Sequence, residues 1–319
     1  MKIAIFGATS EIAKDLILSF SAHDKHDLDL FARRPKEVMR WLSTVNLSNK
    51  YVVNGFESFH HVSDLDAILN FVGPGDPSKA IALGASILEI TEKYDYLALE
   101  YLKENPKCKY IFMSSGAVYG ENFIQPASAS TQTPLSIDQI EPDNYYAAAK
   151  IQAELRHRDL SNLDIIDLRL FSYFSHTQSL NSSFFMTGVM RALKNKEMLI
   201  TSSQNMVRDY LSITDFYQLV QKALLTSGIN LAVDCYSMAP IDKFEILSQL
   251  RDELGLRYQL QDGVVGINAT GNKINYYSLN HSAKHFGYVP SKNSSTSILT
   301  EARLVFNDDS LGHSIKKMI

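Results

Sequence analysis

The sequence predicts an α/β fold in which a doubly wound parallel sheet is joined to a smaller C-terminal lobe. Three observations support this prediction. The chain opens on a short apolar strand that turns directly into a helical pattern. Further apolar runs follow at intervals long enough for a helix, and this alternation weakens beyond residue 171. Alternating strands and helices form right-handed crossovers, which give a parallel sheet with helices on both faces.

The first element, Lys2–Phe6, is apolar at nearly every position, as is typical of a parallel strand buried on both faces. Gly7 and the small residues after it predict a tight turn. Ile12, Leu16 and Phe20 then place an apolar face on a helix. Further strands are predicted at residues 28–32, 52–53, 67–72, 110–113 and 165–170.

The second part of the chain is less regular. Helices are predicted at residues 181–195, 214–225 and 243–254, with short strands between them. The segments 268–275 and 291–297 are polar and rich in turn residues. We therefore expect a dinucleotide-binding domain over residues 1–171 and a smaller substrate-binding lobe over residues 172–319, interleaved with the first.

Composition excludes several classes of protein. The 31 basic and 35 acidic residues give a net charge of −4, so no basic excess indicates nucleic acid as a partner. No apolar run approaches the ~20 residues of a membrane span, and Glu11 interrupts the apolar start before a signal peptide could form. Two cysteines fit a reducing compartment. We expect a soluble cytoplasmic protein.

The opening strand, turn and helix are the first functional signal. A helix N-terminus at the carboxyl end of a parallel strand offers free N–H groups to a diphosphate. Ser10 and Ala13 stand where a G-x-x-G-x-x-G loop has its second and third glycines, and both are small. A plain strand-turn-helix without a ligand is the alternative, but the position directly after a buried strand favours a dinucleotide.

The end of the second predicted strand bears on which dinucleotide is bound. An acid there would bind the ribose hydroxyls of NAD, whereas arginine accommodates the 2′-phosphate of NADP. Arg33 and Arg34 follow this strand, with no acid beside them. The pair favours NADP, with NAD possible, and the alternative is a solvated basic turn.

Tyr146 and Lys150 are four residues apart, which puts a phenol and an ammonium on one face of a helix. A lysine charge favours the phenolate and would lower the pKa of the tyrosine towards the range of an acid–base catalyst. About one such pair is expected by chance in a chain with 16 tyrosines. Its place between two predicted strands gives the pair its weight.

Ser115 is near the end of the apolar run that begins at Tyr110, at the sheet edge where ligands gather. Its hydroxyl is suited to bind a substrate oxygen on which charge develops. A serine-rich turn from strand to loop is the alternative.

In this order, the signals resemble the extended short-chain dehydrogenase/reductase family, in its branch of nucleotide-sugar epimerases, dehydratases and reductases. The resemblance runs from Lys2 to about Pro290 and includes segments 66–73, 167–171 and 282–290. The most specific segment, Arg208 to Asp215, is similar to the family pattern R-D-[FY]-[IV]-x-[VI]-x-D. In that pattern the arginine binds the substrate's diphosphate.

The resemblance implies a role for each matching residue. Tyr146 would exchange a proton with the sugar oxygen, Lys150 would hold the nicotinamide ribose, and Ser115 would bind the reacting oxygen. Ser115, Ser172 and Arg208 would contact the nucleotide sugar. The implied cofactor-binding residues are Gly7, Thr9, Ser10, Glu11, Ile12, Arg33, Arg34, Val72, Gly73, Tyr146 and Lys150. A homodimer is also implied.

The departures from the family pattern narrow the function. Dehydratases carry an acid pair directly after the catalytic serine or threonine, and Gly116-Ala117 stand there instead, so a dehydratase is rejected. Ser172 replaces an asparagine, and Ser175-His176 replace a Gly-Pro. His176 is either a second base or, more simply, a surface or structural histidine.

The resulting prediction is an NADP-dependent reductase of a nucleotide-linked 4-keto-6-deoxyhexose. The alternatives are a nucleotide-sugar epimerase with tightly bound NAD and a non-catalytic dinucleotide sensor. No metal site is predicted, because the histidines near His23 and His60 lack the spacing of a metal site. Arg156, His157 and Arg158 are interpreted as a solvated helix end.

Overall fold

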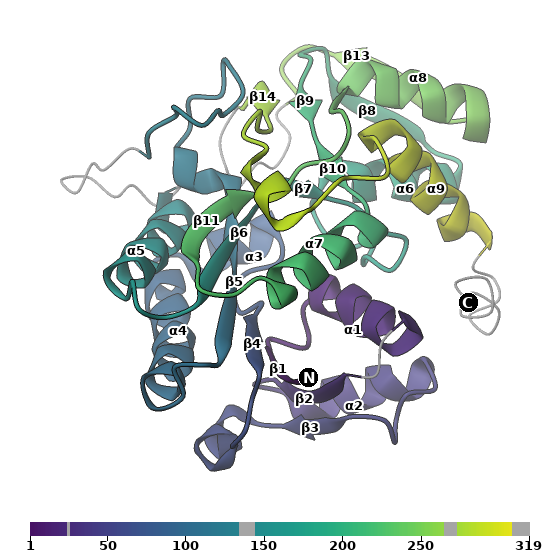
Figure 1. Cartoon of the computed structure of the whole chain (residues 1–319). Helices are drawn as coiled ribbons and strands as arrows, with labels where there is room; N and C mark the ends of the chain where they lie inside the picture. Colours follow the sequence, from purple (N-terminus) through teal and green to yellow (C-terminus); the bar gives the residue numbers. More distant parts are fainter. Residues whose placement is uncertain (24–25, 134–143, 265–272, 308–319) are drawn as a thin grey trace.

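A seven-stranded parallel sheet forms the centre of the protein, in the order β3-β2-β1-β4-β5-β6-β11 (Figure 1). The structure is a computed structural model that describes residues 1–23, 26–133, 144–264 and 273–307. The strands of this sheet are β1 (Lys2–Phe6), β2 (Asp27–Phe31), β3 (Val52–Asn54), β4 (Ala67–Asn70), β5 (Lys109–Ser115), β6 (Ile165–Leu170) and β11 (Asn230–Asp234).

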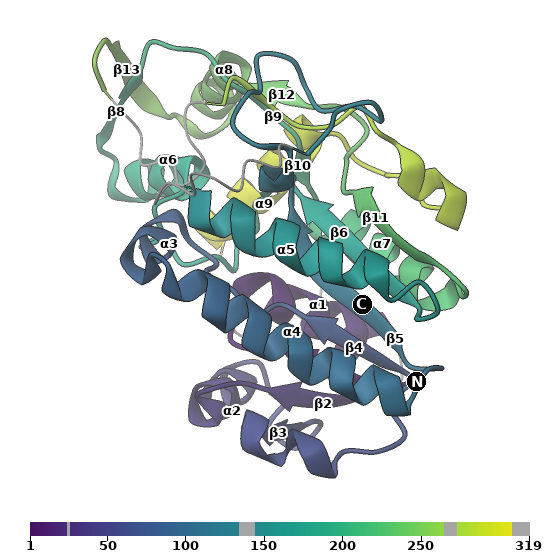
Figure 2. The same cartoon turned by 90° about the vertical axis from the view of Figure 1, so that its left-hand side faces the viewer.

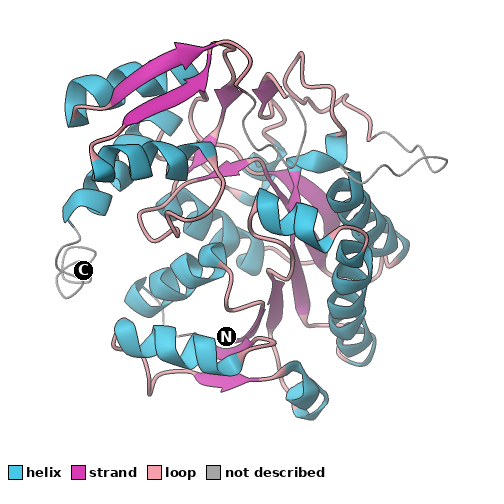
Figure 3. Ribbon diagram, turned by 180° about the vertical axis from the view of Figure 1, so that it is seen from behind, coloured by secondary structure: helices cyan, strands magenta, loops and turns pink. Residues whose placement is uncertain are grey.

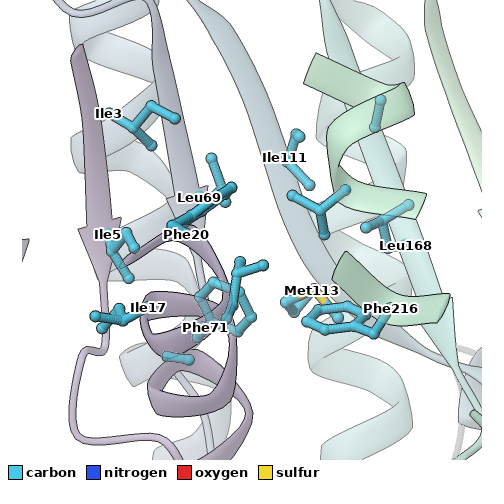
Figure 4. Packing of buried hydrophobic residues seen from close by; sticks show 14 of the residues in the cluster. Ile3, Ile5, Ile17, Phe20, Leu69, Phe71, Ile111, Met113, Leu168 and Phe216 are labelled. Carbon is cyan, nitrogen blue, oxygen red and sulfur yellow. The ribbon is translucent and has the colours of Figure 1, made fainter. Parts of the chain in front are cut away.

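Helices cover both faces of the sheet. They are α1 (Glu11–His23), α2 (Pro35–Thr44), α3 (Pro77–Leu83), α4 (Ser86–Glu104), α5 (Tyr145–Asp159) and α7 (Ile213–Leu225). Ile3 and Ile5 pack with α1, α2 and α7, whereas Ala4 and Phe6 pack with α4 and α5. Figure 2 shows α4 and α5 side by side over one face, and Figure 4 shows residues of α1, α7 and the strands packed on the other.

One row of side chains crosses the face under α4 and α5. Phe6 of β1 is aligned with Asn70 of β4. Phe112 of β5 is next in the row, followed by Asp167 of β6. Aligned residues of parallel strands point to the same face, so this row places two polar side chains inside an otherwise apolar layer.

The smaller lobe lies at the carboxyl ends of the main strands. Its two-stranded sheet of β8 and β13 is far from β3 (Figure 1 and Figure 3). Its helices are α6 (Phe185–Asn195), α8 (Lys243–Leu254) and α9 (Ser294–Asn307). Its strands are β7 (Ser172–Tyr173), β8 (Met198–Ser202), β9 (Val207–Arg208), β10 (Tyr210–Leu211), β12 (Ile241–Asp242), β13 (Arg257–Gln261) and β14 (Asn275–Tyr276). In both parts of the molecule, the described residues also include 3₁₀ turns: η1 (Phe56–His61), η2 (Gly116–Tyr119) and η4 (Ser282–Phe286).

The predicted α/β fold is confirmed, and strands occur at all six predicted positions. The helix at 243–254 has the predicted bounds, whereas α6 begins at Phe185 rather than at residue 181. Ser183 precedes it because its N–H and hydroxyl donate to Asp76. Beyond residue 171, β11 returns to the main sheet and pairs with β6.

The polar, turn-rich segment 291–297 includes the start of α9, at Ser294. Although its first turn is rich in serine, α9 has a buried apolar face, on which Ile298 and Ala302 are one turn apart. Most of the other polar, turn-rich segment, 268–275, lies outside the described residues. Within the described ranges, no helix is long and apolar enough to span a membrane.

Candidate active site

The turn after β1 requires glycine. Gly7 has a φ of +76°, and a Cβ there would lie 2.9 Å from the carbonyl carbon of Phe71 and 3.0 Å from the nitrogen of Val72. The N–H groups of Gly7 and Ala8 both donate to the carbonyl of Phe31. The turn is therefore held against the ends of β2 and β4, where the first N–H groups of α1 are available to a diphosphate.

The other predicted residues of this turn lie at the same edge. Thr9 and Ser10 are half-buried in the turn, and Ile12 packs against the apolar core. The carboxylate of Glu11 accepts the N–H of Ser179 at 2.8 Å and so faces the smaller lobe. These residues fit a dinucleotide diphosphate. A diphosphate can approach the backbone of the turn closely, and the negative charge of Glu11 is already bonded to the Ser179 N–H.

Arg33 and Arg34 follow β2 directly and are exposed. Arg34 pairs with Glu37 at 3.2 Å in the first turn of α2. Both guanidiniums are therefore accessible at the edge where the ribose of a dinucleotide would end.

Ser115, Tyr146 and Lys150 meet at the carboxyl end of β5. Lys150 donates to the carbonyl of Met113 at 2.7 Å, and its Nζ lies 5.8 Å from the centre of the Tyr146 ring. Ser115 is the buried last residue of β5, and its Oγ accepts the N–H of Ala117 at 3.2 Å. Gly73 is beside the same ammonium, since a Cβ at Gly73 would be 3.7 Å from Lys150 Nζ.

The direction of the pKa shift at Tyr146 differs from the sequence prediction. Burial raises the pKa of Tyr146, against the smaller opposing effect of its hydrogen bond with Ser115. Burial lowers the pKa of Lys150 to about 8, although the charges of Asp95, Asp167 and Glu154 oppose this shift. The Lys150 ammonium instead donates to the Met113 carbonyl, and burial is the largest influence on the pKa of Tyr146.

A pair of buried cations lies next to Ser115. Arg208 and Lys273 contact the ring of Tyr276, at 5.7 Å and 4.8 Å from its centre. The Tyr276 hydroxyl is 3.3 Å from Ser115 Oγ. Burial lowers the pKa of Arg208 and brings that of Lys273 to about 8. Neither cation forms an ion pair with a carboxylate of the described residues.

Lys273 and Tyr276 were not predicted from the sequence. They lie in and beside a segment that is rich in turn residues, where no periodicity marks a buried side chain. Their burial comes from packing against Phe123, whose ring centre is 5.2 Å from Lys273 Nζ and 4.9 Å from the Tyr276 ring. A local pattern in the sequence therefore gives no sign of them.

The remaining predicted substrate residues lie on neighbouring strands. Ser172 in β7 is aligned with Tyr210 in β10, two residues beyond Arg208. His176 instead binds the carboxylate of Glu301 in α9, through its N–H at 3.0 Å and its Nδ1 at 2.7 Å. This contact gives His176 a structural role, in agreement with the simpler of the two interpretations.

The position after Ser115 has no room for an acid. A Cβ at Gly116 would lie 2.4 Å from the ring of Phe171, and the next residue is Ala117. Where a dehydratase has its acid pair, this chain thus has a glycine packed against an aromatic ring, followed by alanine. In the described part of the chain, no group of three or more histidine, cysteine or acidic residues is placed to hold a metal ion.

The interpretation of residues 156–158 as a solvated helix end is wrong. His157 is fully buried, with a carboxylate at each ring nitrogen. Arg156 bonds to Asp95, and Arg158 bonds to Asp167. The sequence did not indicate this, because the two acids lie in other elements, α4 and β6.

Comparison with protein families decides the classification. A family model described as the NAD dependent epimerase/dehydratase family matches residues 3–231. The chain belongs to this family. No curated protein sequence matches it.

Solved structures of nucleotide-sugar enzymes have the same fold. One is a UDP-N-acetylglucosamine 4-epimerase from Methanobrevibacter ruminantium M1, with a TM-score of 0.78, 18% identity, and coverage of 97% of this chain and 98% of that one. Another is a dTDP-glucose 4,6-dehydratase from Bacillus anthracis in complex with NAD, with a TM-score of 0.77, 16% identity and 99% coverage of both chains. A UDP-glucose 4-epimerase from Bifidobacterium longum, in complex with NAD+ and UDP, has a TM-score of 0.74, 13% identity, and coverage of 97% and 99%.

Proposed function

We propose that the protein is an NADP-dependent oxidoreductase that reduces the keto group of a nucleotide-linked sugar of the 4-keto-6-deoxyhexose type. The observation that carries this proposal is the contact chain from Ser115 through Tyr276 to the buried Arg208 and Lys273. It places an oxygen-binding hydroxyl beside two cations without ion-pair partners among the described residues. A nucleotide sugar has both matching parts, a reactive sugar oxygen and a diphosphate.

Each catalytic residue has a role that its contacts support. A nicotinamide dinucleotide, when bound, supplies the hydride. The Gly7 turn and the start of α1 hold its diphosphate, and Lys150 holds its ribose. Ser115 binds the sugar oxygen, and Tyr146 donates a proton to that oxygen from its Oη. Because burial raises the pKa of Tyr146, its hydroxyl keeps its proton at neutral pH, as a proton donor requires.

Two features bear on the choice between reductase and epimerase. Arg33 and Arg34, with no acid between them and β2, favour the 2′-phosphate of NADP. Arg34 is already paired with Glu37, which weakens that preference and favours the alternative, an epimerase with tightly bound NAD. The reductase is preferred because Arg33 forms no ion pair with another described residue and is exposed at the strand end.

Two measurements on the purified protein separate these functions. We expect no nicotinamide to remain bound after purification, as judged by mass spectrometry of the denatured supernatant. We also expect one of a panel of keto-sugar nucleotides to cause consumption of NADPH in preference to NADH. Retained NAD with no net consumption of NADPH would instead establish the epimerase.

The substitution Tyr146→Phe tests catalysis itself. Turnover should fall by at least about a hundredfold, the contribution of a positioned general acid, whereas NADPH should still bind. Ser115→Ala is the matched variant, because it removes the other hydroxyl at the same site. Unchanged turnover in Tyr146→Phe would remove this tyrosine from the mechanism, and binding of NADPH without any turnover by the unsubstituted protein would favour the sensor.

A further inference from the structure

His157 is buried between two carboxylates on the sheet-facing side of α5. Its Nδ1 is 2.7 Å from Asp167 Oδ1, and its Nε2 is 2.8 Å from Asp95 Oδ1. The side chain is 0% exposed. A carboxylate can only accept hydrogen bonds, so both ring nitrogens must donate. The geometry therefore requires an imidazolium cation.

The surroundings of His157 agree with a permanent charge. Burial alone would lower its pKa, but Asp167 and Asp95 outweigh burial and raise the pKa to about 9. The charged groups facing it come from three elements: Asp95 of α4, Asp167 of β6, and Arg156, Arg158 and, beyond the Phe112 ring, Lys150 of α5. The Phe112 ring is close to both Lys150 and His157, with its centre 4.4 Å from Lys150 Nζ and 5.2 Å from the centre of the His157 ring.

The hydrogen bonds continue from Asp95 to the end of β4. Tyr110 donates to Asp95 Oδ1 at 3.0 Å and accepts from Asn70 Nδ2 at 2.8 Å. The Asn70 Oδ1 then accepts the N–H of Val72 at 2.9 Å. In this series of hydrogen bonds, each donor group is held in place by the acceptor to which it bonds. We call these five side chains, Asp167, His157, Asp95, Tyr110 and Asn70, the buried chain.

The backbone turn at Val72 and Gly73, where the buried chain ends, lies between two parts of the candidate cofactor site. On one side, a Cβ at Gly7 would lie 3.0 Å from the Val72 nitrogen. On the other, a Cβ at Gly73 would lie 3.7 Å from Lys150 Nζ. A small shift of this turn would therefore change the space between the diphosphate turn and the lysine.

We propose that His157 is a positioning residue, whose charge holds the buried chain and, through it, the Val72–Gly73 turn in the arrangement that binds a nicotinamide dinucleotide. This inference rests on the proposed function for the identity of the ligand. It concerns residues that the catalytic roles above do not use.

The charge on His157 is tested first, by NMR of protein labelled at its histidine ring nitrogens. The chain has nine histidines, and comparison with His157→Gln identifies the signal. We expect both nitrogens to carry protons at pH 8 in the unsubstituted protein. In Asp95→Asn, an amide donor replaces one acceptor, so the ring should lose a proton at lower pH. A neutral ring at pH 7 in the unsubstituted protein would overturn the proposal.

The positioning role is tested with Tyr110→Phe, which breaks the buried chain between Asp95 and Asn70 but leaves His157 and both carboxylates in place. The dissociation constant for NADPH should rise about fivefold to tenfold, the effect of one buried hydrogen bond. The control is Asp164→Asn, which removes a 2.7 Å ion pair with Lys109 at the amino end of β5. It should lower the melting temperature and leave the NADPH affinity unchanged.

The outcomes separate this proposal from the proposed function. If Tyr110→Phe lowers the melting temperature as Asp164→Asn does and leaves NADPH affinity unchanged, the buried chain is purely structural and the positioning role is overturned. If the unsubstituted protein binds neither NADPH nor NADH, the proposed function itself fails. A weaker affinity confined to Tyr110→Phe supports the positioning role whichever sugar is the substrate.

Discussion

Two buried lysines lie at the candidate site. Lys150 and Lys273 are both buried, and burial lowers the pKa of each to about 8. Neither forms an ion pair with the residues that the structure describes. A buried cation without a counter-charge reduces stability. Such groups are more common where a ligand brings the opposite charge, which supports the proposed contact of Lys273 with the diphosphate.

The substitution Lys273→Met should therefore weaken substrate binding and stabilise the folded chain. We expect the KM for the nucleotide sugar to rise about tenfold or more, the loss of one charge-assisted contact, with a smaller change in kcat. The free energy of unfolding at pH 7 should increase, because methionine carries no buried charge. Denaturation in urea and steady-state kinetics measure the two effects.

Its control is Lys243→Met, since Lys243 is equally buried but donates to the carbonyls of Ser202 and Gln204. That variant should lose stability and keep its KM. Burial lowers the pKa of Lys243 as well as that of Lys273, so the pH dependence of stability has the same sign for both lysines. Between pH 8 and 10.5 the unfolded chain binds more protons at Lys273 than the folded one, so this lysine makes stability rise with pH. Lys273→Met should lack that contribution, and an unchanged KM would remove Lys273 from the substrate site.

At the scale of elements, the connection from β5 into η2 depends on close packing. The space of a Cβ at Gly116 is occupied by the Phe171 ring at 2.4 Å. Gly116→Ala should therefore reduce the free energy of unfolding by about 1–3 kcal/mol, the usual cost of overpacking. Thermal unfolding measures this change.

Gly75→Ala is the matched control, because no atom lies within 4 Å of the position of its Cβ. It should be close to neutral. In the double variant Gly116→Ala/Phe171→Leu, a smaller side chain relieves the contact, and part of the lost stability should return. An equal loss of stability in Gly116→Ala and Gly75→Ala would show that packing against Phe171 is not the cause.

The elements also show what the sequence can reveal. The strands were predictable because buried parallel strands are apolar throughout, and the Gly7 turn because it directly follows one. The inward side of α5 was not, since Lys150, Glu154 and His157 give it no apolar stripe. The partners of His157 are 62 residues before it and 10 after it. Only the folded sheet brings such residues together.

At the scale of the whole molecule, polar contacts link the smaller lobe to α1. Asp15 of α1 is buried and accepts hydrogen bonds from Tyr173 at 2.8 Å and Thr177 at 2.6 Å. Burial raises the pKa of Asp15 to about 6. Together with the bond from Ser179 to Glu11, these contacts connect the segment after β6 to the helix that begins at the cofactor turn.

The raised pKa of Asp15 gives a prediction about pH. Between pH 4 and 6 the folded chain binds more protons at Asp15 than the unfolded one, so this residue makes stability fall as pH rises. Asp15→Asn removes that effect and should increase the free energy of unfolding at pH 7 by on the order of 2 kcal/mol. The difference should vanish near pH 4. Urea denaturation at both pH values checks this, and an equal loss of stability at both would contradict it.

The return of β11 to the main sheet has a consequence for synthesis on the ribosome. The strand that covers the edge of β6 comes from residues 230–234, so a nascent chain of 171 residues has every other strand of the sheet but leaves that edge open. Unpaired edges of this kind attach to other chains. A fragment ending at residue 171 should therefore aggregate more readily than the whole chain, in which the less buried β11 is the end strand instead of β6.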